Sequence, residues 1–134
     1  MNTIGPLLVD AARRWKEGIA TAVEPIGLTA NAYLLLNAYD SLHQKRLPPS
    51  QAAAARLTKL DVNVTAQEMK FLAEHHLINR TTSKIDTRSY NVTLTLAGTQ
   101  LLHVARTAVQ NFEKQFYASI EPKHFAEALR SLTK

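Results

Sequence analysis

The sequence contains no cysteine, only four glycines and a single tryptophan among its 134 residues. Without cysteine the chain can form neither disulfides nor thiolate metal sites, and it cannot sense oxidants through a thiol. The four glycines form no phosphate-binding loop or nucleophile elbow, so we expect no catalytic centre. The five histidines have no metal-ligand spacing, and the adjacent His75 and His76 point to different sides of a helix. We therefore expect neither a metal nor a cofactor.

Long hydrophobic runs are also missing. Spanning a bilayer takes roughly 18 to 20 consecutive apolar residues, and no stretch of the sequence approaches that length. The first residues lack the basic region and apolar stretch of a secretory signal. These absences predict a cytoplasmic protein without a membrane-bound segment.

What is present is ordinary globular composition, with 46% hydrophobic and 20% charged residues, and the length suits one domain spanning residues 1–134. The net charge of +5 and the pI near 9.7 favour an anionic partner, and nucleic acid is the first candidate. The charge is unevenly distributed. Residues 61–95 hold four basic and four acidic side chains, so this stretch carries no net charge.

Helical periodicity dominates the first half of the chain. Apolar residues recur at three- and four-residue steps from Ile4 to Val23, and this stripe ends before Pro25, because the residue preceding a proline resists the helical conformation. Thr29 and Ser50 are suitable N-cap residues for a second and a third helix.

A fourth helix is predicted from about Asp61 or Asn63 to His76. Its start is ambiguous, because the stretch from Thr65 to Glu68 has the form of a capping box and would begin the helix slightly later. The inward face would carry Met69, Leu72, Ala73 and His76. The opposite face would carry Asn63, Ala66, Gln67 and Lys70.

The pattern then changes to that of strands. Residues 77–82 and 89–95 are rich in β-branched and aromatic side chains, and Tyr90, Val92 and Leu94 alternate with polar residues, as in a half-buried strand. Residues 83–88 between the two stretches are polar. Together they predict a β-hairpin.

Helical periodicity returns after Gly98 for a long stretch, and Pro122 suits the first turn of a last helix. The expected order is four helices, a hairpin and two helices. A short helix pair followed by a hairpin is the winged helix-turn-helix arrangement, so we predict a mainly α fold of this type. The second helix of such a pair fits the major groove of DNA, and the hairpin reaches the neighbouring backbone or minor groove.

Several motifs in this order resemble the MarR family of bacterial transcriptional regulators. The pair Leu28-Thr29 leads into a helix similar to that family's opening motif, and Asp86-Thr87-Arg88 stands where the family has a D-x-R motif in its wing. The strand that follows ends Leu94-Thr95-x-x-Gly98, and Glu121-Pro122 is similar to the start of the family's last helix.

The resemblance implies a homodimer that binds a pseudo-palindromic operator as a repressor and is released by a small phenolic or lipophilic ligand. It places a DNA-binding lobe at about residues 29–95 and dimerisation helices at about 1–26 and 97–134. It also implies that Arg88 enters the minor groove, oriented by Asp86, where the negative potential of a narrow groove attracts arginine.

The DNA contacts predicted on this basis come from the fourth helix and the hairpin. Gln67 would contact adenine and Lys70 phosphate, while Asn63 and Ser50 would position helix ends on phosphate. The complete predicted set is Ser50, Asn63, Ala66, Gln67, Lys70, Arg80, Lys84, Asp86 and Arg88.

The apolar stripes of the first and the last two helices exceed what a small winged-helix core can cover, and large exposed apolar patches usually mark interfaces. We therefore predict a dimer interface, with Trp15 belonging to its packing or to a ligand pocket. Its residues would be Ile4, Leu8, Ala11, Trp15, Phe112, Phe116, Phe125 and Leu129. An alternative function stays open because residues 61–95 carry no net charge: a winged-helix dimer that binds other proteins and binds DNA weakly or not at all.

Overall fold

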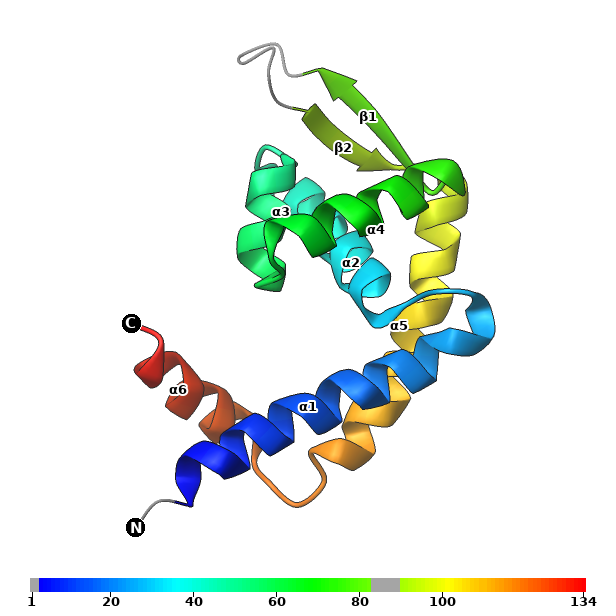
Figure 1. Ribbon diagram of the computed structural model, residues 1–134. Coiled ribbons are helices and arrows are strands. Elements are labelled where there is room, and N and C mark those ends of the chain that lie inside the picture. The colour runs from blue at the N-terminus through cyan, green and yellow to red at the C-terminus, as the bar shows by residue number, and fades with distance from the viewer. Residues whose placement is uncertain (1–2, 83–89) are drawn as a thin grey trace.

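The computed structural model describes residues 3–82 and 90–134, and the order of elements in these ranges confirms the predicted winged-helix arrangement. Figure 1 shows the elements in space. In chain order they are α1 (Ile4–Val23), a short 3₁₀ turn (Glu24–Ile26), α2 (Ala30–Gln44), α3 (Gln51–Thr58), α4 (Val62–Glu74), β1 (Ile78–Thr82), β2 (Tyr90–Leu94), α5 (Leu96–Phe116) and α6 (Pro122–Leu132).

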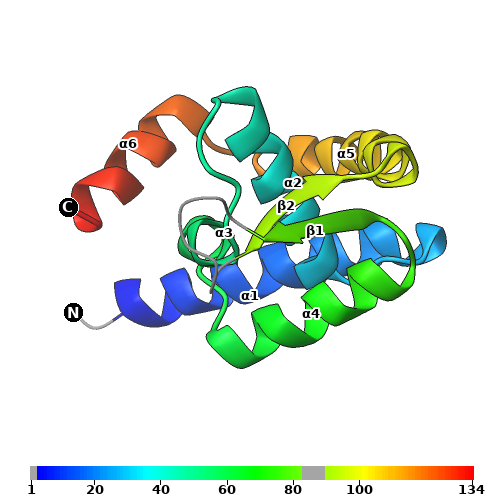
Figure 2. The same cartoon turned by 90° about the horizontal axis from the view of Figure 1, so that it is seen from above.

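Different helices and strands form the two ends of the molecule. At one end α1 packs against the C-terminal part of α5, and α6 and both termini lie beside them (Figure 1). At the other end α2, α3, α4 and the hairpin pack together, with the hairpin outermost. Figure 2 shows α4 along an outer edge of this end, beside the hairpin.

A single apolar core joins the two ends, and α2 lies at its centre. Most residues of α2 are buried, and the core takes further side chains from every other helix except α6. Its largest fully buried side chains are Ile19, Val23, Leu35, Leu36, Tyr39, Met69, Leu72, Val92 and Leu102. Because α1 and α5 contribute to the same core as α2, the end formed by α2, α3, α4 and the hairpin has no separate core of its own.

The predicted caps of α2 and α3 are confirmed. The Thr29 hydroxyl accepts a hydrogen bond from the Ala32 amide at 3.0 Å, and the Ser50 hydroxyl accepts one from the Ala53 amide at 3.1 Å. Each bond satisfies an amide that the first helical turn leaves without an internal partner.

The structure shows which of the two predicted positions starts α4. Asp61 is the N-cap and accepts a hydrogen bond from the Val64 amide at 2.8 Å. The capping box from Thr65 to Glu68 is wrong, because Thr65 lies inside the helix, is 1% exposed, and donates its hydroxyl proton to the Asp61 carbonyl at 2.8 Å.

The end of α4 differs from the prediction. The helix ends at Glu74, and His76 is exposed with a φ of 57°, so its predicted inward position is wrong. Backbone bonds from the His76 amide to the Ala73 carbonyl and from the Leu77 amide to the Leu72 carbonyl close the helix. This is the left-handed ending that glycine usually provides, and here histidine adopts it.

The hairpin is a two-stranded antiparallel sheet in which Ile78 pairs with Leu94 and Thr82 pairs with Tyr90. The segment before α3 adds a short third edge, because Ser50 bridges to Asn91 and the Val92 amide donates to the Pro49 carbonyl at 2.8 Å. The hairpin is thereby attached to α3 as well as to its own flanking helices.

Within the described ranges, no single helix is long and apolar enough to cross a membrane; α1 with its 3₁₀ turn and α2 pass only when taken together, and they meet at 89°.

Candidate nucleic-acid interface

The outward face of α4 carries the polar side chains predicted to contact DNA. The helix buries Thr65, Met69 and Leu72 toward the core. Its opposite side exposes the four predicted contact residues, Asn63, Ala66, Gln67 and Lys70. The sequence therefore predicted the rotation of α4 correctly, because buried residues three and four apart fix which face points outward.

The core beneath α4 contains a polar contact that the sequence did not indicate. The Tyr39 hydroxyl from α2 donates a hydrogen bond to the Met69 sulfur at 3.2 Å, and both side chains are 1% exposed. Burial raises the pKa of the Tyr39 phenol, and the nearby positive charge of Arg80 opposes this rise. The contact gives a buried hydroxyl a partner directly behind the exposed face of α4.

Lys70 is the only cation of α4. Its ammonium lies 4.0 Å from the Glu74 carboxylate one turn later, and both side chains are mostly exposed, at 78% and 60%. An ion pair in this setting contributes little to stability, so it does not hold Lys70 in place. Lys70 can turn toward a phosphate without the loss of a strong interaction.

The predicted hairpin contacts divide into two groups. Arg80 lies on β1, opposite Val92, and is exposed. Lys84, Asp86 and Arg88 fall at residues 83–89, outside the described ranges, so their predicted contacts remain predictions. Ser50 is half-buried, caps α3 and bridges to β2. Ser50 therefore has a structural role, because it joins α3 to the hairpin.

The base of the hairpin is tied to both neighbouring helices. The Thr95 hydroxyl donates to the His76 carbonyl at 2.7 Å and accepts from the Gly98 amide at 3.0 Å. The Thr95 amide donates to the Leu77 carbonyl at 3.0 Å. These bonds hold the end of α4 and the start of α5 to the two strands, so the hairpin and α4 keep a fixed relative position.

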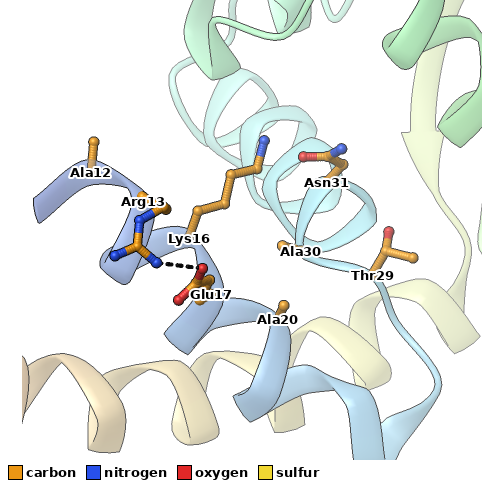
Figure 3. Close-up of a pocket in the computed structure, with 8 residues that line it drawn as sticks. All are labelled: Ala12, Arg13, Lys16, Glu17, Ala20, Thr29, Ala30 and Asn31. Carbon is orange, nitrogen blue, oxygen red and sulfur yellow. Dashed lines mark hydrogen bonds and ion pairs between the residues drawn. The ribbon is translucent and has the colours of Figure 1, made fainter. Parts of the chain in front are cut away.

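A cavity of about 510 Å³ lies between α1 and the start of α2 (Figure 3). Three alanines, Ala12, Ala20 and Ala30, line it together with polar and charged side chains, and Lys16 extends across it toward Asn31. The Asn31 side-chain oxygen is buried and has no hydrogen-bond partner among the described residues. Lys16 makes no ion pair with any described residue, whereas Arg13 is bonded to Glu17 at 2.7 Å and to Asp10.

One wall of this cavity is connected to α4. Thr29 lines the cavity, and its hydroxyl donates to the Glu68 carboxylate of α4 at 3.0 Å. The sequence could not reveal this bond, because the two residues are 39 positions apart and neither belongs to a motif that pairs them. This bond and the hydrogen bond between Tyr39 and Met69 are the side-chain contacts behind α4 that sequence reasoning missed.

The predicted dimer-interface residues gather at the other end of the molecule. Leu8, Ala11, Trp15, Phe116, Phe125 and Leu129 line one apolar hollow of about 150 Å³ between α1, α5 and α6. Ile4 lies beyond this hollow and is 75% exposed.

Two aromatic members of that set are also engaged within the chain. Phe112 packs on the core, and its ring lies over Gly18. The Trp15 indole donates a hydrogen bond to the Glu113 carboxylate at 2.9 Å, and the same side chain lines a further cavity of about 510 Å³ with residues of α2 and α3. Trp15 therefore lines both the apolar hollow and this cavity, and its predicted part in a dimer interface or a ligand pocket remains a prediction.

No protein-family profile and no curated protein matches this sequence. The three-dimensional structure, in contrast, matches many solved MarR-family structures along nearly the whole chain. Bordetella bronchiseptica BpsR, a protein whose DNA binding is regulated by 6-hydroxynicotinic acid, is 20% identical with a TM-score of 0.83, and the match covers 99% of this chain and 100% of BpsR.

Two further structures extend the comparison. A MarR-family transcriptional regulator from a Rhodococcus species is 21% identical with a TM-score of 0.81, and the match covers 98% of this chain and 90% of that one. A mutant of Escherichia coli MarR in complex with operator DNA is 14% identical with a TM-score of 0.79, and the match covers 98% and 92%. The chain therefore has the winged helix-turn-helix fold of the MarR-family transcriptional regulators over nearly its whole length.

Proposed function

We propose that the protein is a cytoplasmic transcriptional repressor without a catalytic centre, which binds a pseudo-palindromic DNA operator as a homodimer. One observation carries the proposal: α4 presents a row of exposed polar side chains beside a hairpin that is fixed to it by hydrogen bonds. That is the arrangement by which a winged helix-turn-helix enters the major groove and contacts the flanking backbone.

The homodimer is supported by the apolar side chains left exposed on α1 and α6. Ile4, Leu7 and Val9 are 65% to 75% exposed, and Leu132 is 73% exposed. A cluster of this kind at the end that carries both termini is typical of an interface. A second copy joined there would lie at the end of the molecule opposite the hairpin (Figure 1).

The test is a fluorescence-anisotropy titration of the protein against DNA upstream of its own gene, repeated at several salt concentrations. Specific binding should weaken with salt, and the slope of log K against log salt should amount to several units, because phosphate contacts release counterions. Salt-insensitive or undetectable binding would contradict the proposal. It would favour the alternative function, a winged-helix dimer that binds proteins. The absence of net charge in residues 61–95 supports that alternative.

Two variants with matched controls locate the interface. Lys70→Ala should reduce the salt slope by about 1 unit for each protomer, because one phosphate contact is lost. Lys123→Ala removes an exposed lysine from α6 and should leave the slope unchanged. Gln67→Ala should weaken binding to the operator, whereas Gln110→Ala on the exposed side of α5 should not.

A small phenolic or lipophilic effector is the second part of the proposal. The cavities beside α1 and α2 are large enough for a single-ring acid, and one of them is connected to α4 through Thr29 and Glu68. Adding aromatic acids, with 6-hydroxynicotinic acid among them, to the DNA complex should release the DNA for at least one compound. The fluorescence of Trp15, the single tryptophan, should report the binding, since this side chain lines the neighbouring cavity.

A further inference from the structure

Val62 is an apolar side chain of α4 that does not pack against the core. It is the first residue of the helix and is 75% exposed, and α4 has no other large hydrophobic side chain in an exposed position. A single exposed valine is common on protein surfaces and needs no explanation by itself. Its neighbours on the helix are what give it significance.

Ala66 lies one turn after Val62 and is also exposed, so the two apolar groups are adjacent on the helix surface. The exposed amides of Asn63 and Gln67 each follow directly in sequence and occupy the adjoining strip of the same outward face. The first two turns of α4 therefore present two small apolar groups beside two amides. The N-terminal residues of a recognition helix are those that contact base edges.

This combination of groups matches one base pair better than the other. In the major groove, adenine offers its N7 and N6 atoms to an asparagine or glutamine amide, and thymine offers a methyl group to apolar side chains. Guanine is contacted chiefly by arginine or lysine. The segment from Val62 to Glu74 contains no arginine, and its one lysine, Lys70, lies two turns from the start beside Glu74.

We propose that the first two turns of α4 select A·T base pairs, with Asn63 and Gln67 contacting adenine and Val62 and Ala66 contacting the thymine methyl. The half-sites of the operator are therefore rich in A·T pairs at the positions beneath α4. This inference rests on the proposed function, because it requires that α4 enter the major groove, and it goes further by assigning the bases.

Deoxyuridine provides the most selective test, because it differs from thymidine only in lacking the methyl group. Operator duplexes are first selected from a random pool, and each thymine of a half-site is then replaced singly by uracil. We expect about fourfold weaker binding at one or two positions, and about fifteenfold when both half-sites carry the replacement. The adenines and thymines beneath α4 should dominate the selected sequences.

The variant Val62→Ala identifies the side chain that contacts the methyl. Binding to the thymine duplex should weaken, and uracil replacement at one position should cause no further loss. Val104→Ala is the matched control, since Val104 lies on α5 and is 51% exposed, and its thymine preference should be that of the unchanged protein. Thermal unfolding and gel filtration of both variants establish that fold and assembly are intact.

The outcomes separate this inference from the proposed function. If the selected duplexes are G·C-rich beneath α4, or if uracil replacement and Val62→Ala leave specific binding unchanged, the base assignment is overturned while the regulator stands. If no duplex is selected at any salt concentration, the proposed function itself fails. Equal losses for Val62→Ala and Val104→Ala would also overturn the role of Val62.

Discussion

Gly98 is the position where the addition of one methyl group should do most damage to the end formed by α2, α3, α4 and the hairpin. It is buried in the first turn of α5, and a Cβ atom there would lie 2.0 Å from the Leu77 carbonyl oxygen and 3.0 Å from its carbon. Both are backbone atoms, so rotation of a side chain cannot relieve the overlap. The start of α5 or the base of β1 must move by about 1 Å, and the carbonyl would lose its bond from the Thr95 amide.

Gly98→Ala should lower the free energy of unfolding by about 3 kcal/mol. Overpacking contributes about 1–3 kcal/mol and the strained hydrogen bond about 1 kcal/mol, offset by less than about 1 kcal/mol of improved helix propensity. For a chain of this size the midpoint of thermal unfolding should fall by about 10 °C. The measurement is thermal unfolding by circular dichroism at one fixed protein concentration, since association changes apparent stability.

Gly5→Ala is the matched control. No atom lies within 4 Å of a Cβ built there, so nothing has to move. The gain in helix propensity is opposed by the ring of Pro6, which disfavours a helical conformation in the residue before it, so the change should stay below about 0.5 kcal/mol. If Gly98→Ala unfolds at the same temperature as Gly5→Ala, the close contact between α5 and Leu77 is refuted.

Three further predictions concern the core and its tyrosines. Met69→Leu should destabilise the protein by about 1–3 kcal/mol, because it leaves the Tyr39 hydroxyl buried without a partner. In chemical denaturation, Tyr39→Phe should lower the free energy of unfolding by less, and the double variant should recover part of the loss caused by Met69→Leu. Gly18→Ala should cost about 2 kcal/mol, because its Cβ would lie 1.9 Å from the Phe112 ring, and adding Phe112→Leu should cost less than the sum of the two single changes. Burial makes the pKa of Tyr39 higher in the folded chain than in the unfolded chain. This group therefore leaves the free energy of unfolding unchanged below about pH 10 and should lower it above that pH by about 1.4 kcal/mol per pH unit. Denaturant unfolding measured across this pH range should show a shallower fall for Tyr39→Phe, and an equal fall would contradict the burial of this phenol.

Local and periodic features were the part of the fold that could be predicted from sequence. The caps Thr29 and Ser50 and the outward face of α4 each depend on residues within a few positions of one another, and all are confirmed. Prediction was wrong at Thr65 and His76 for the same reason. Each belongs to a pattern with two local solutions, and packing against the rest of the chain determined the outcome: Thr65 is buried, and the chain turns at His76 to reach β1.

Long-range side-chain contacts were outside the reach of sequence reasoning. The hydrogen bonds from Thr29 to Glu68 and from Tyr39 to Met69 join residues 39 and 30 positions apart. No periodicity specifies such pairs, because the position of α4 against α2 depends on the whole core. For the candidate site, this means that its exposed residues could be predicted but the groups that hold α4 from behind could not.

The attachment of the hairpin to the start of α5 makes this helix a lever. With 21 residues α5 is about 30 Å long, and it runs from the hairpin base to the end where α1 and α6 lie. In the proposed dimer a tilt of about 5° at the far end would therefore displace the hairpin and α4 by about 3 Å. Since two recognition helices must be separated by about one turn of DNA, or 34 Å, a displacement of that size in each protomer changes the fit to both half-sites at once. Small changes in packing around α1 and α5 would in this way be amplified into a change of operator affinity, without any local rearrangement of α4 itself.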